Sequence, residues 1–516
     1  MTDSTPRLVI VSNRLGDPRK TASGGLAVAL GDALAGSGGL WFGWSGKIAE
    51  AGASGDGDMH RQRAGEVELV TIDLSQADHD AYYAGYSNQA LWPAFHYRLD
   101  LADFASGFFD GYQRVNRLFA RKLARLLRPD DVIWVHDYHL IPLADELRAL
   151  GCRQRIGFFL HIPLPPPPIL AAIPGHEWLM RSFFAYDLVG LQTRADADHF
   201  ARFVQEEAGA MALGQDTFEA MGRRVIARSF PIGIDVGEFQ RLASSNESRQ
   251  TEAMLKRQYG HRRLLVGIDR LDYSKGLLCR FRAFRELLAN YPENINTATL
   301  IQIASPTRET VQAYGALLSE LEGLAGAING DFGELDWLPI RYLHRTWARR
   351  RLPALYRAAA VALVTPLRDG MNLVAKEYVA MQDEANPGVL VLSRFAGAAE
   401  QMREALLVNP YDIPATAQAI QRALQMPLDE RRARHAALLQ QIQEHDVHDW
   451  CRSFLTTLNA VSLRAQGALQ EVSRAAPTTR AVRARRSADR DRSTGLSAAA
   501  WRADPGGFPA GPATRR

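Results

Sequence analysis

The sequence has few cysteines, no long apolar run and no export signal. Its three cysteines, Cys152, Cys279 and Cys451, are far apart, and no CxxC pair occurs in the 516 residues. Such usage argues against a disulfide or zinc framework and fits a reducing compartment. No stretch of about 18 or more apolar residues is present, which argues against a membrane-spanning helix. Because the N-terminus also lacks a basic region followed by an apolar core, we expect a cytoplasmic protein without membrane partners.

Several catalytic motifs are missing as well. The sequence contains no GxxxxGKS/T, no GxGxxG after a predicted strand, no GxSxG and no HExxH. Kinases, dehydrogenases, serine hydrolases and zinc proteases therefore lose their usual support. No DxDxT-like segment follows a strand, which argues against a fused phosphatase.

Positive charge is concentrated at the end of the chain. The formal net charge is +4, but the ten arginines and four acidic residues of 471–516 give +6, so residues 1–470 sum to −2. The body of the chain has no basic patch with interleaved aromatic residues, and we expect no nucleic-acid partner. The tail is rich in Ala, Arg, Ser, Thr, Pro and Gly, a composition that predicts disorder.

Apolar runs along the chain indicate an α/β protein. We expect buried strands at 8–13, 132–137, 155–163 and 187–193, and a second series at 264–269, 298–304, 360–366 and 388–394. Helices are expected between them, around 113–127, 140–150, 278–290, 308–324, 372–383 and 414–425. Continuous apolar runs are typical of parallel strands buried on both faces. Two successive series of this kind predict two facing, doubly wound Rossmann-like domains.

The predicted domains are 1–234 and 235–469, followed by a disordered basic tail at 470–516. We expect the last helix of the second domain to pack back on the first. Ligands of doubly wound sheets bind beyond the carboxyl ends of the strands. Polar residues placed just after a strand therefore carry most of the functional information.

In the first half, Arg14 directly follows a strand and precedes the pair Gly24 and Gly25. A guanidinium can bind a phosphate bidentately, and glycines let a backbone approach a diphosphate. A tight turn with a surface arginine fits equally well. Tyr83 and Trp92 lie in an aromatic-rich segment. Their rings suit sugar faces, although dense aromatics more often belong to a core.

The next two strands also end in polar residues. Asp137 lies in the segment HDYH, where it is placed to orient a sugar hydroxyl or to accept a proton. His136 and His139 are three apart, but the chain leaves a strand there, so we discount a metal site. His161 precedes the proline run 165–168, which would fix its ring at the cleft. A satisfied core histidine is the alternative.

The second half carries two further clusters. Arg270 and Lys275 lie between a strand and a helix start, where cations oppose the helix dipole, so a bound diphosphate explains them better than stability does. The segment 368–378, RDGMNLVAKEY, turns from a strand into a helix. Asp369 offers an acceptor for sugar hydroxyls, and Glu377 offers one for a ribose diol.

With these clusters, the chain resembles the trehalose-6-phosphate synthases, retaining glycosyltransferases with two facing Rossmann-like domains, the GT-B architecture. The matching stretches include SNRL, GLWFGWSG, YYAGYSNQALWPAFHYR, WVHDYHL, GFFLHIP, DRLDYSKG and TPLRDGMNLVAKEY, in order from about residue 7 to about 450. The tail lies outside the resemblance.

The resemblance implies a role for each matching residue. The acceptor, glucose 6-phosphate, would be bound by Arg14, Tyr83, Trp92, Asp137 and Arg308. The donor, a nucleotide-glucose such as UDP-glucose, would be bound by Gly25, His161, Arg270, Lys275, Asp369, Met371, Asn372, Leu373, Val374 and Glu377. Arg270, Lys275, Asp137 and His161 would form the catalytic group. We expect no cofactor and no metal, and a homo-oligomer with a tetramer as one candidate.

The resemblance also implies a mechanism. The acceptor would attack from the same face as the leaving diphosphate, which takes the acceptor proton, so that the α configuration is retained. One departure concerns the loop after HIP, where Pro168 stands in place of a usual acidic residue. Two rivals remain open. Glucosylglycerol-phosphate synthases and related pseudo-glycosyltransferases share the architecture and differ at the acceptor site, and a non-catalytic sugar-phosphate sensor would not need an intact donor site.

Overall fold

The computed structural model describes residues 6–15, 30, 34, 39–49, 59–308 and 311–461, and its strands form two sheets. Sequence predictions for Gly24, Gly25 and the tail 470–516 lie outside the described residues. All described residues belong to one unit, 1–467.

The first sheet has ten strands in the order β3-β4-β2-β1-β5-β6-β7-β10-β9-β8. They are β1 (Leu8–Arg14), β2 (Gly39–Ile48), β3 (Met59–Ala64), β4 (Val67–Leu74), β5 (Val132–His136), β6 (Arg155–Phe159), β7 (Leu188–Leu191), β8 (Met211–Ala212), β9 (Thr217–Ala220) and β10 (Arg223–Ser229). The seven strands from β4 to β10 in this order pair in parallel, and β3, β9 and β8 add antiparallel edges.

The second sheet is parallel throughout, in the order β13-β12-β11-β14-β15-β16. Its strands are β11 (Arg263–Arg270), β12 (Ala298–Ser305), β13 (Ile340–Leu343), β14 (Ala359–Val364), β15 (Val389–Ser393) and β16 (Leu406–Val408). This is the 3-2-1-4-5-6 order of a Rossmann sheet, with its switch point between β11 and β14. The predicted pair of doubly wound α/β sheets is thereby confirmed.

Helices follow most of the parallel strands. With the first sheet lie α2 (Gln76–Asp78), the π-helix η1 (His79–Leu91), α3 (Trp92–Phe95), α4 (Ser106–Ala124), α5 (Leu143–Ala149), α6 (Pro167–Leu170), α7 (His176–Ser182) and α8 (Arg194–Ala208). After β10 come α9 (Val236–Ala243), α10 (Asn246–Tyr259), α11 (Leu277–Asn290), α12 (Gln312–Phe332), α13 (Leu352–Ala358), α14 (Leu373–Met381), α15 (Ile413–Gln425), α16 (Leu428–Glu444) and α17 (Val447–Ala460). No helix in the described part of the chain is both long and apolar enough to cross a membrane.

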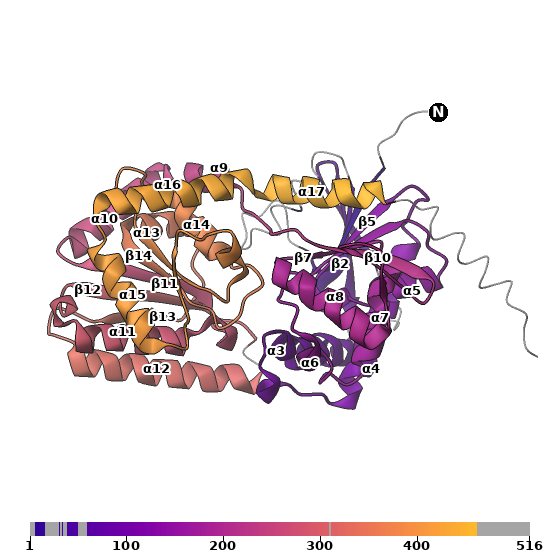
Figure 1. Ribbon diagram of the computed structural model, residues 1–516, viewed down its shortest axis with the longest axis horizontal. Helices are drawn as coiled ribbons and strands as arrows, with labels where there is room; N and C mark the ends of the chain where they lie inside the picture. Colours follow the sequence, from indigo (N-terminus) through magenta and orange to yellow (C-terminus); the bar gives the residue numbers. More distant parts are fainter. Residues whose placement is uncertain are drawn as a thin grey trace, which may run out of the picture. The chain divides into compact units, whose positions relative to one another are not determined.

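The last two helices reach elements of both sheets. Figure 1 draws α16 and α17 in yellow, one after the other, and α16 packs on α14, whereas α17 packs on β6 and β7. The Phe454 ring stacks on Trp134 of β5 at 4.5 Å between centroids. Gly157 and Gly190 leave the space that Phe454 fills, because an added Cβ would lie 2.8 Å and 2.7 Å from its ring.

Three sequence expectations differ from the structure. Strands β2 to β4 are not among the predicted strands; β2 is broken by glycines, β3 is mostly exposed and polar, and β4 alternates apolar with polar residues. The strand predicted at 155–163 ends at Phe159, so His161 lies in the following loop. The helix predicted from 308 starts at Gln312, because Arg308 adopts a left-handed backbone with φ 48° that a helix cannot continue through.

Candidate functional site

The predicted site residues of the second half gather at the switch point of the second sheet. Arg270 is the last residue of β11, and the 3-10 turn η5 (Tyr273–Lys275) leads from it into α11. The loop after β14 carries Asp369 and leads into α14. Because β11 and β14 are neighbours, both loops leave the sheet at the same edge.

A cavity of about 830 Å³ opens at this edge. Nine residues predicted for the donor line it, namely His161, Arg270, Lys275, Asp369, Met371, Asn372, Leu373, Val374 and Glu377. His161 comes from the first half of the chain and the other eight from the second. Residues some 200 positions apart in sequence therefore form one wall, and the cavity is large enough for a drug-sized or nucleotide-sized ligand.

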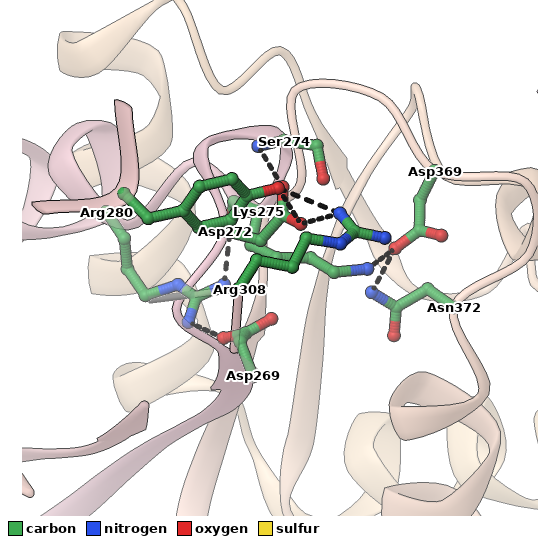
Figure 2. Close-up of polar contacts among 9 residues, drawn as sticks. Asp269, Asp272, Ser274, Lys275, Arg280, Arg308, Asp369 and Asn372 are labelled. Carbon is green, nitrogen blue, oxygen red and sulfur yellow. Dashed lines mark hydrogen bonds and ion pairs between the residues drawn. The ribbon is translucent and has the colours of Figure 1, made fainter. Parts of the chain in front are cut away.

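Lys275 and Asp369 form an ion pair inside the cavity, with 2.5 Å between Nζ and Oδ2 (Figure 2). The Asn372 amide donates to the same oxygen at 3.0 Å. Burial alone would raise the pKa of Asp369, but Lys275 outweighs it and lowers the pKa below the usual value. Asn372 holds a left-handed backbone, φ 73°, just before α14 begins. The carboxylate is thus ionised and held at the wall of the cavity.

Arg308 is buried rather than solvated. Its guanidinium donates to Asp272 at 3.3 Å (Figure 2). It also donates to the Tyr314 hydroxyl at 2.8 Å and to the Tyr138 hydroxyl at 3.3 Å. Burial would raise the pKa of Asp272, but Arg308 and Arg270 outweigh it and bring the pKa to about 2. The alternative of an ordinary helix start at this arginine is therefore wrong.

Trp92 lies against this cation. The Arg308 guanidinium carbon is 3.8 Å from the centre of the Trp92 ring, and that of Arg270 is 5.3 Å away. Both distances suit cation–π contact. One tryptophan from the first half therefore contacts two arginines from the second, next to the donor cavity.

Asp137 holds an unusual backbone directly after β5. Its φ of 77° and ψ of 164° lie in a region that is essentially restricted to glycine. The Oδ1 atom accepts from the backbone N–H of His161 at 3.2 Å. Burial raises the pKa of Asp137 to about 6, although backbone hydrogen bonds and Arg308 oppose the shift. Strain and a raised pKa in one residue are typical of a functional site.

His161 is neutral and held from two sides. Burial lowers its pKa to about 3. Its Nε2 lies 3.1 Å from Nδ1 of His136, and its Nδ1 lies 3.5 Å from the Gln192 amide nitrogen. His139 instead stacks on Tyr83, with 6.0 Å between ring centroids. Among the described residues, no group of three His, Cys, Asp or Glu side chains is arranged for a metal.

Arg14, the last residue of β1, and Tyr83, in η1, belong to the first half of the chain and do not line the donor cavity. The Arg14 guanidinium carbon is 4.9 Å from the Trp44 ring, and that ring is 5.4 Å from Tyr83. Tyr83 belongs to the thirteen-residue π-helix η1, a rare element often found at functional sites. His139 and Tyr138 lie between Tyr83 and Arg308, because His139 stacks on Tyr83, its ring centre is 3.9 Å from that of Tyr138, and Tyr138 accepts from Arg308.

Glycine permits the loop after β14 to touch the loop after β6. A Cβ on Gly370 would lie 2.2 Å from the carbonyl oxygen of His161, and a Cβ on Gly397 would lie 1.9 Å from that of Gly370. Both distances are far below van der Waals contact. Any larger residue at Gly370 would push the donor loop away from His161.

The proline run in the loop after His161 begins a helix. Pro167 and Pro168 are the first residues of α6, where a proline is tolerated because its missing N–H would have no helical partner. The Pro168 side chain is exposed. Pro168 is therefore the exposed second residue of a short helix whose ends, Pro167 and Leu170, are buried.

The structure adds residues that the sequence analysis missed. Gln192, Trp347 and Arg350 line the donor cavity, and Trp44 lies beside Arg14 and Tyr83. Trp44 is part of GLWFGWSG, so an aromatic in a segment shared with the family was the available signal. Gln192 and Arg350 follow no motif that would have singled them out.

Comparisons with known proteins agree with this geometry. The family model for glycosyltransferase family 20 matches residues 11–460. A trehalose-6-phosphate synthase of Sinorhizobium fredii is 48% identical over 89% of this chain and 99% of its own length. One from Klebsiella pneumoniae is 46% identical over 89% of this chain and 96% of its own length.

Solved structures share the fold and not only the sequence. A UDP-forming α,α-trehalose-phosphate synthase of Burkholderia xenovorans, in complex with glucose-6-phosphate, superposes with a TM-score of 0.84 at 49% identity, over 88% of this chain and 100% of that one. An E. coli structure bound with UDP-2-fluoro glucose gives 0.84 at 45% identity, over 88% and 99%.

Proposed function

This chain belongs to glycosyltransferase family 20, and we propose that it transfers glucose from UDP-glucose to glucose 6-phosphate, releasing UDP and forming α,α-trehalose 6-phosphate. The observation that carries the proposal is the cavity of about 830 Å³ whose walls bring together His161, two cations and the loop at 369–374. Its position at the switch point of a Rossmann sheet suits a nucleotide.

In the proposed reaction, Arg270 and Lys275 bind the donor diphosphate, and Asp369 and His161 bind the donor glucose. Charge grows on the leaving diphosphate in the transition state, so fixed cations in a cavity shielded from water lower the barrier most. The acceptor attacks from the same face, and the leaving oxygen takes its proton. Glu377 binds the ribose, and Gly25 with the 371–374 backbone completes the donor site.

The acceptor site is proposed to consist of Arg14, Tyr83, Trp92, Asp137 and Arg308, next to the donor cavity. We also propose a homo-oligomer, a tetramer in one form, acting in the cytoplasm in trehalose biosynthesis. The two domains would be 1–234 and 235–469, with the acceptor site mainly on the first.

A panel of acceptors with product identification tests the function. With UDP-glucose, glucose 6-phosphate should yield trehalose 6-phosphate. Free glucose should be poor in kcat as well as KM, because it lacks the phosphate whose binding would help to assemble the site. Comparable kcat/KM values for glucose and glucose 6-phosphate would contradict the proposed trehalose-6-phosphate synthase activity. Transfer to glycerol 3-phosphate instead would favour a glucosylglycerol-phosphate synthase, and no transfer at all would favour a sensor.

Arg308→Ala tests the phosphate site directly. Loss of a charged hydrogen-bond partner costs about 1.5–3 kcal/mol, so KM for glucose 6-phosphate should rise roughly 10- to 100-fold. The KM for UDP-glucose should change far less. Because Arg308 also pairs with buried Asp272, Tyr314→Phe is the matched control, since it removes one partner of the same guanidinium and keeps the cation. An Arg308→Ala enzyme with unchanged preference for the phosphorylated sugar would remove Arg308 from the site.

A further inference from the structure

Lys376 is a buried lysine that has two neutral partners. It lies on α14, is 1% exposed and donates from Nζ to the backbone carbonyl of Ile232 and to Oε1 of Gln401, each at 2.7 Å. Burial lowers its pKa to about 7, and no carboxylate of the described residues forms an ion pair with it. Burying an ammonium group against uncharged oxygens costs free energy of desolvation, and packing alone would not offset that cost.

The acceptor at Ile232 lies in the segment that joins the two sheets. Ile232 falls between the end of β10 and the start of α9. Its N–H donates to Oε1 of Gln192 at 3.1 Å, and Nε2 of Gln192 lies 3.5 Å from Nδ1 of His161. Three successive contacts therefore run from Lys376 to the histidine of the donor cavity.

The direction of these contacts decides which form of His161 is present. The Gln192 carbonyl oxygen is already used by Ile232, so its NH₂ group faces His161 as a donor. Nδ1 of the neutral ring must then accept, and the ring proton belongs on Nε2, which contacts His136 at 3.1 Å. A shift of the Ile232 segment would free the Gln192 amide to turn over and favour the other tautomer.

Helix α14 reaches both the cavity and the joining segment. Leu373, Val374 and Glu377 line the cavity, whereas Lys376 bonds to the joining segment. From this geometry we propose that Lys376 is a positioning residue for glucosyl transfer, which holds Ile232 so that Gln192 fixes the orientation and tautomer of His161. The inference rests on the proposed function, and it assigns Lys376 no contact with substrate.

Lys376→Met tests the proposal with two readouts. Misplacing a reacting group slightly costs up to about 10²-fold in rate, so kcat with UDP-glucose and glucose 6-phosphate should fall roughly 10-fold or more, with little change in KM for the acceptor. The ring ¹⁵N shifts of His161, assigned with His161→Gln, should move from one tautomer toward a mixture. If Lys376 acts through Gln192, adding Lys376→Met to the Gln192→Leu variant should lower kcat little further.

His435→Leu is the matched control. His435, on α16, is 5% exposed. Its Nε2 lies 3.0 Å from the backbone carbonyl of Val379 on α14, the helix that also carries Lys376, and it forms no hydrogen bond with the joining segment. This variant should lower Tm while leaving kcat and the His161 shifts unchanged. A Lys376→Met enzyme that behaves in the same way would overturn the proposal.

Gln401→Leu covers the case in which Lys376→Met does not fold. It keeps the lysine and removes one of its two acceptors, and it should move kcat and the His161 shifts in the same direction by a smaller amount. Wild-type values of both would overturn the proposal. The ¹⁵N shifts of His161 can be measured without turnover. A wild-type protein without transfer activity would therefore refute the proposed function, whereas the tautomer measurement would still test whether Lys376 positions His161.

Discussion

At the scale of single residues, the donor cations have the most direct consequences. Lys275→Ala and Arg270→Ala should each lower kcat/KM on the order of 10²-fold or more, the cost of losing a group that stabilises transition-state charge. Lys275→Ala also leaves buried Asp369 without its ion pair. Steady-state kinetics with UDP-glucose and glucose 6-phosphate measure the effect.

The control for these variants is Lys256→Ala. Lys256 pairs with Glu252 at 2.7 Å on a helix surface, and its side chain is 59% exposed. Exposed pairs contribute about 1 kcal/mol or less, so activity and stability should stay close to wild type. Near-normal activity of the Lys275 or Arg270 variant would remove that residue from the mechanism.

Protonation of Asp137 should make the activity of the enzyme fall at acidic pH. Burial raises the pKa of Asp137 to about 6 from its usual value of 3.8, so the folded protein protonates this carboxyl as the pH falls through 6. A protonated carboxyl is a weaker acceptor for sugar hydroxyls, and kcat/KM for glucose 6-phosphate should decline below that pH. The phosphate of the acceptor titrates near pH 6 as well. An acid limb that persists unchanged in Asp137→Asn would therefore belong to the substrate.

The stability consequence of the same shift has the opposite sign. Because the fold favours the neutral carboxyl, its ionisation costs stability, which is lost as the pH rises from about 4 to about 6 and stays constant above. Asp137→Asn removes this dependence. Denaturant titrations at pH 4.5 and 7 give the free energy of unfolding of the wild type and of Asp137→Asn. If the difference between the two proteins is the same at both pH values, the raised pKa is contradicted.

At the scale of elements, the site depends on loops that follow strands and on their close approach. Asp137 and His161 follow β5 and β6 of the first sheet, and Gly370, in the loop after β14 of the second sheet, packs against the backbone of His161. Positive φ at Asp137 and Asn372 turns the chain sharply, so that a 3-10 turn begins at Tyr138 and helix α14 begins at Leu373. Short connections of this kind hold side chains more rigidly than long loops would.

Gly370→Ala should disturb this meeting point. Its Cβ would lie 2.2 Å from the carbonyl oxygen of His161, so the donor loop must shift, at a cost of about 1–3 kcal/mol. We expect a clear fall in kcat/KM with a lower Tm. Gly326→Ala in α12 is the control, since no atom lies within 4 Å of its added Cβ and the change should stabilise the helix by up to about 1 kcal/mol. Wild-type kinetics for Gly370→Ala would show that the contact is dispensable.

At the scale of the whole molecule, the basic tail is expected to be separable from the enzyme. Removing residues 471–516 should leave Tm and kcat unchanged, because the segment lacks a core-forming composition. The pI should move to the acidic side, since residues 1–470 carry −2. Isoelectric focusing and thermal melts of both forms test this, and a large loss of Tm or kcat would show that the tail is part of the fold.

The sequence determined the fold class and the local units of the donor site. A strand, a loop and a helix that are neighbours in the chain stay neighbours in space, so Arg270 with Lys275, and Asp369 with Glu377, were predictable from order alone. Apolar runs identified most parallel strands for the same reason. Strand β3 is mostly exposed and polar, and β4 alternates buried apolar residues with half-buried polar ones, so neither forms the continuous apolar run that identified the other strands.

Only the tertiary structure decided which distant residues share an environment. Arg308 pairs with Tyr138, 170 positions away, and Trp44 lies beside Arg14. The raised pKa of Asp137 and the lowered pKa of Lys376 also come from burial that no local pattern encodes. Burial, partner choice and backbone strain depend on how complete sheets pack, because each is set by atoms brought near by the whole fold rather than by neighbours in the chain.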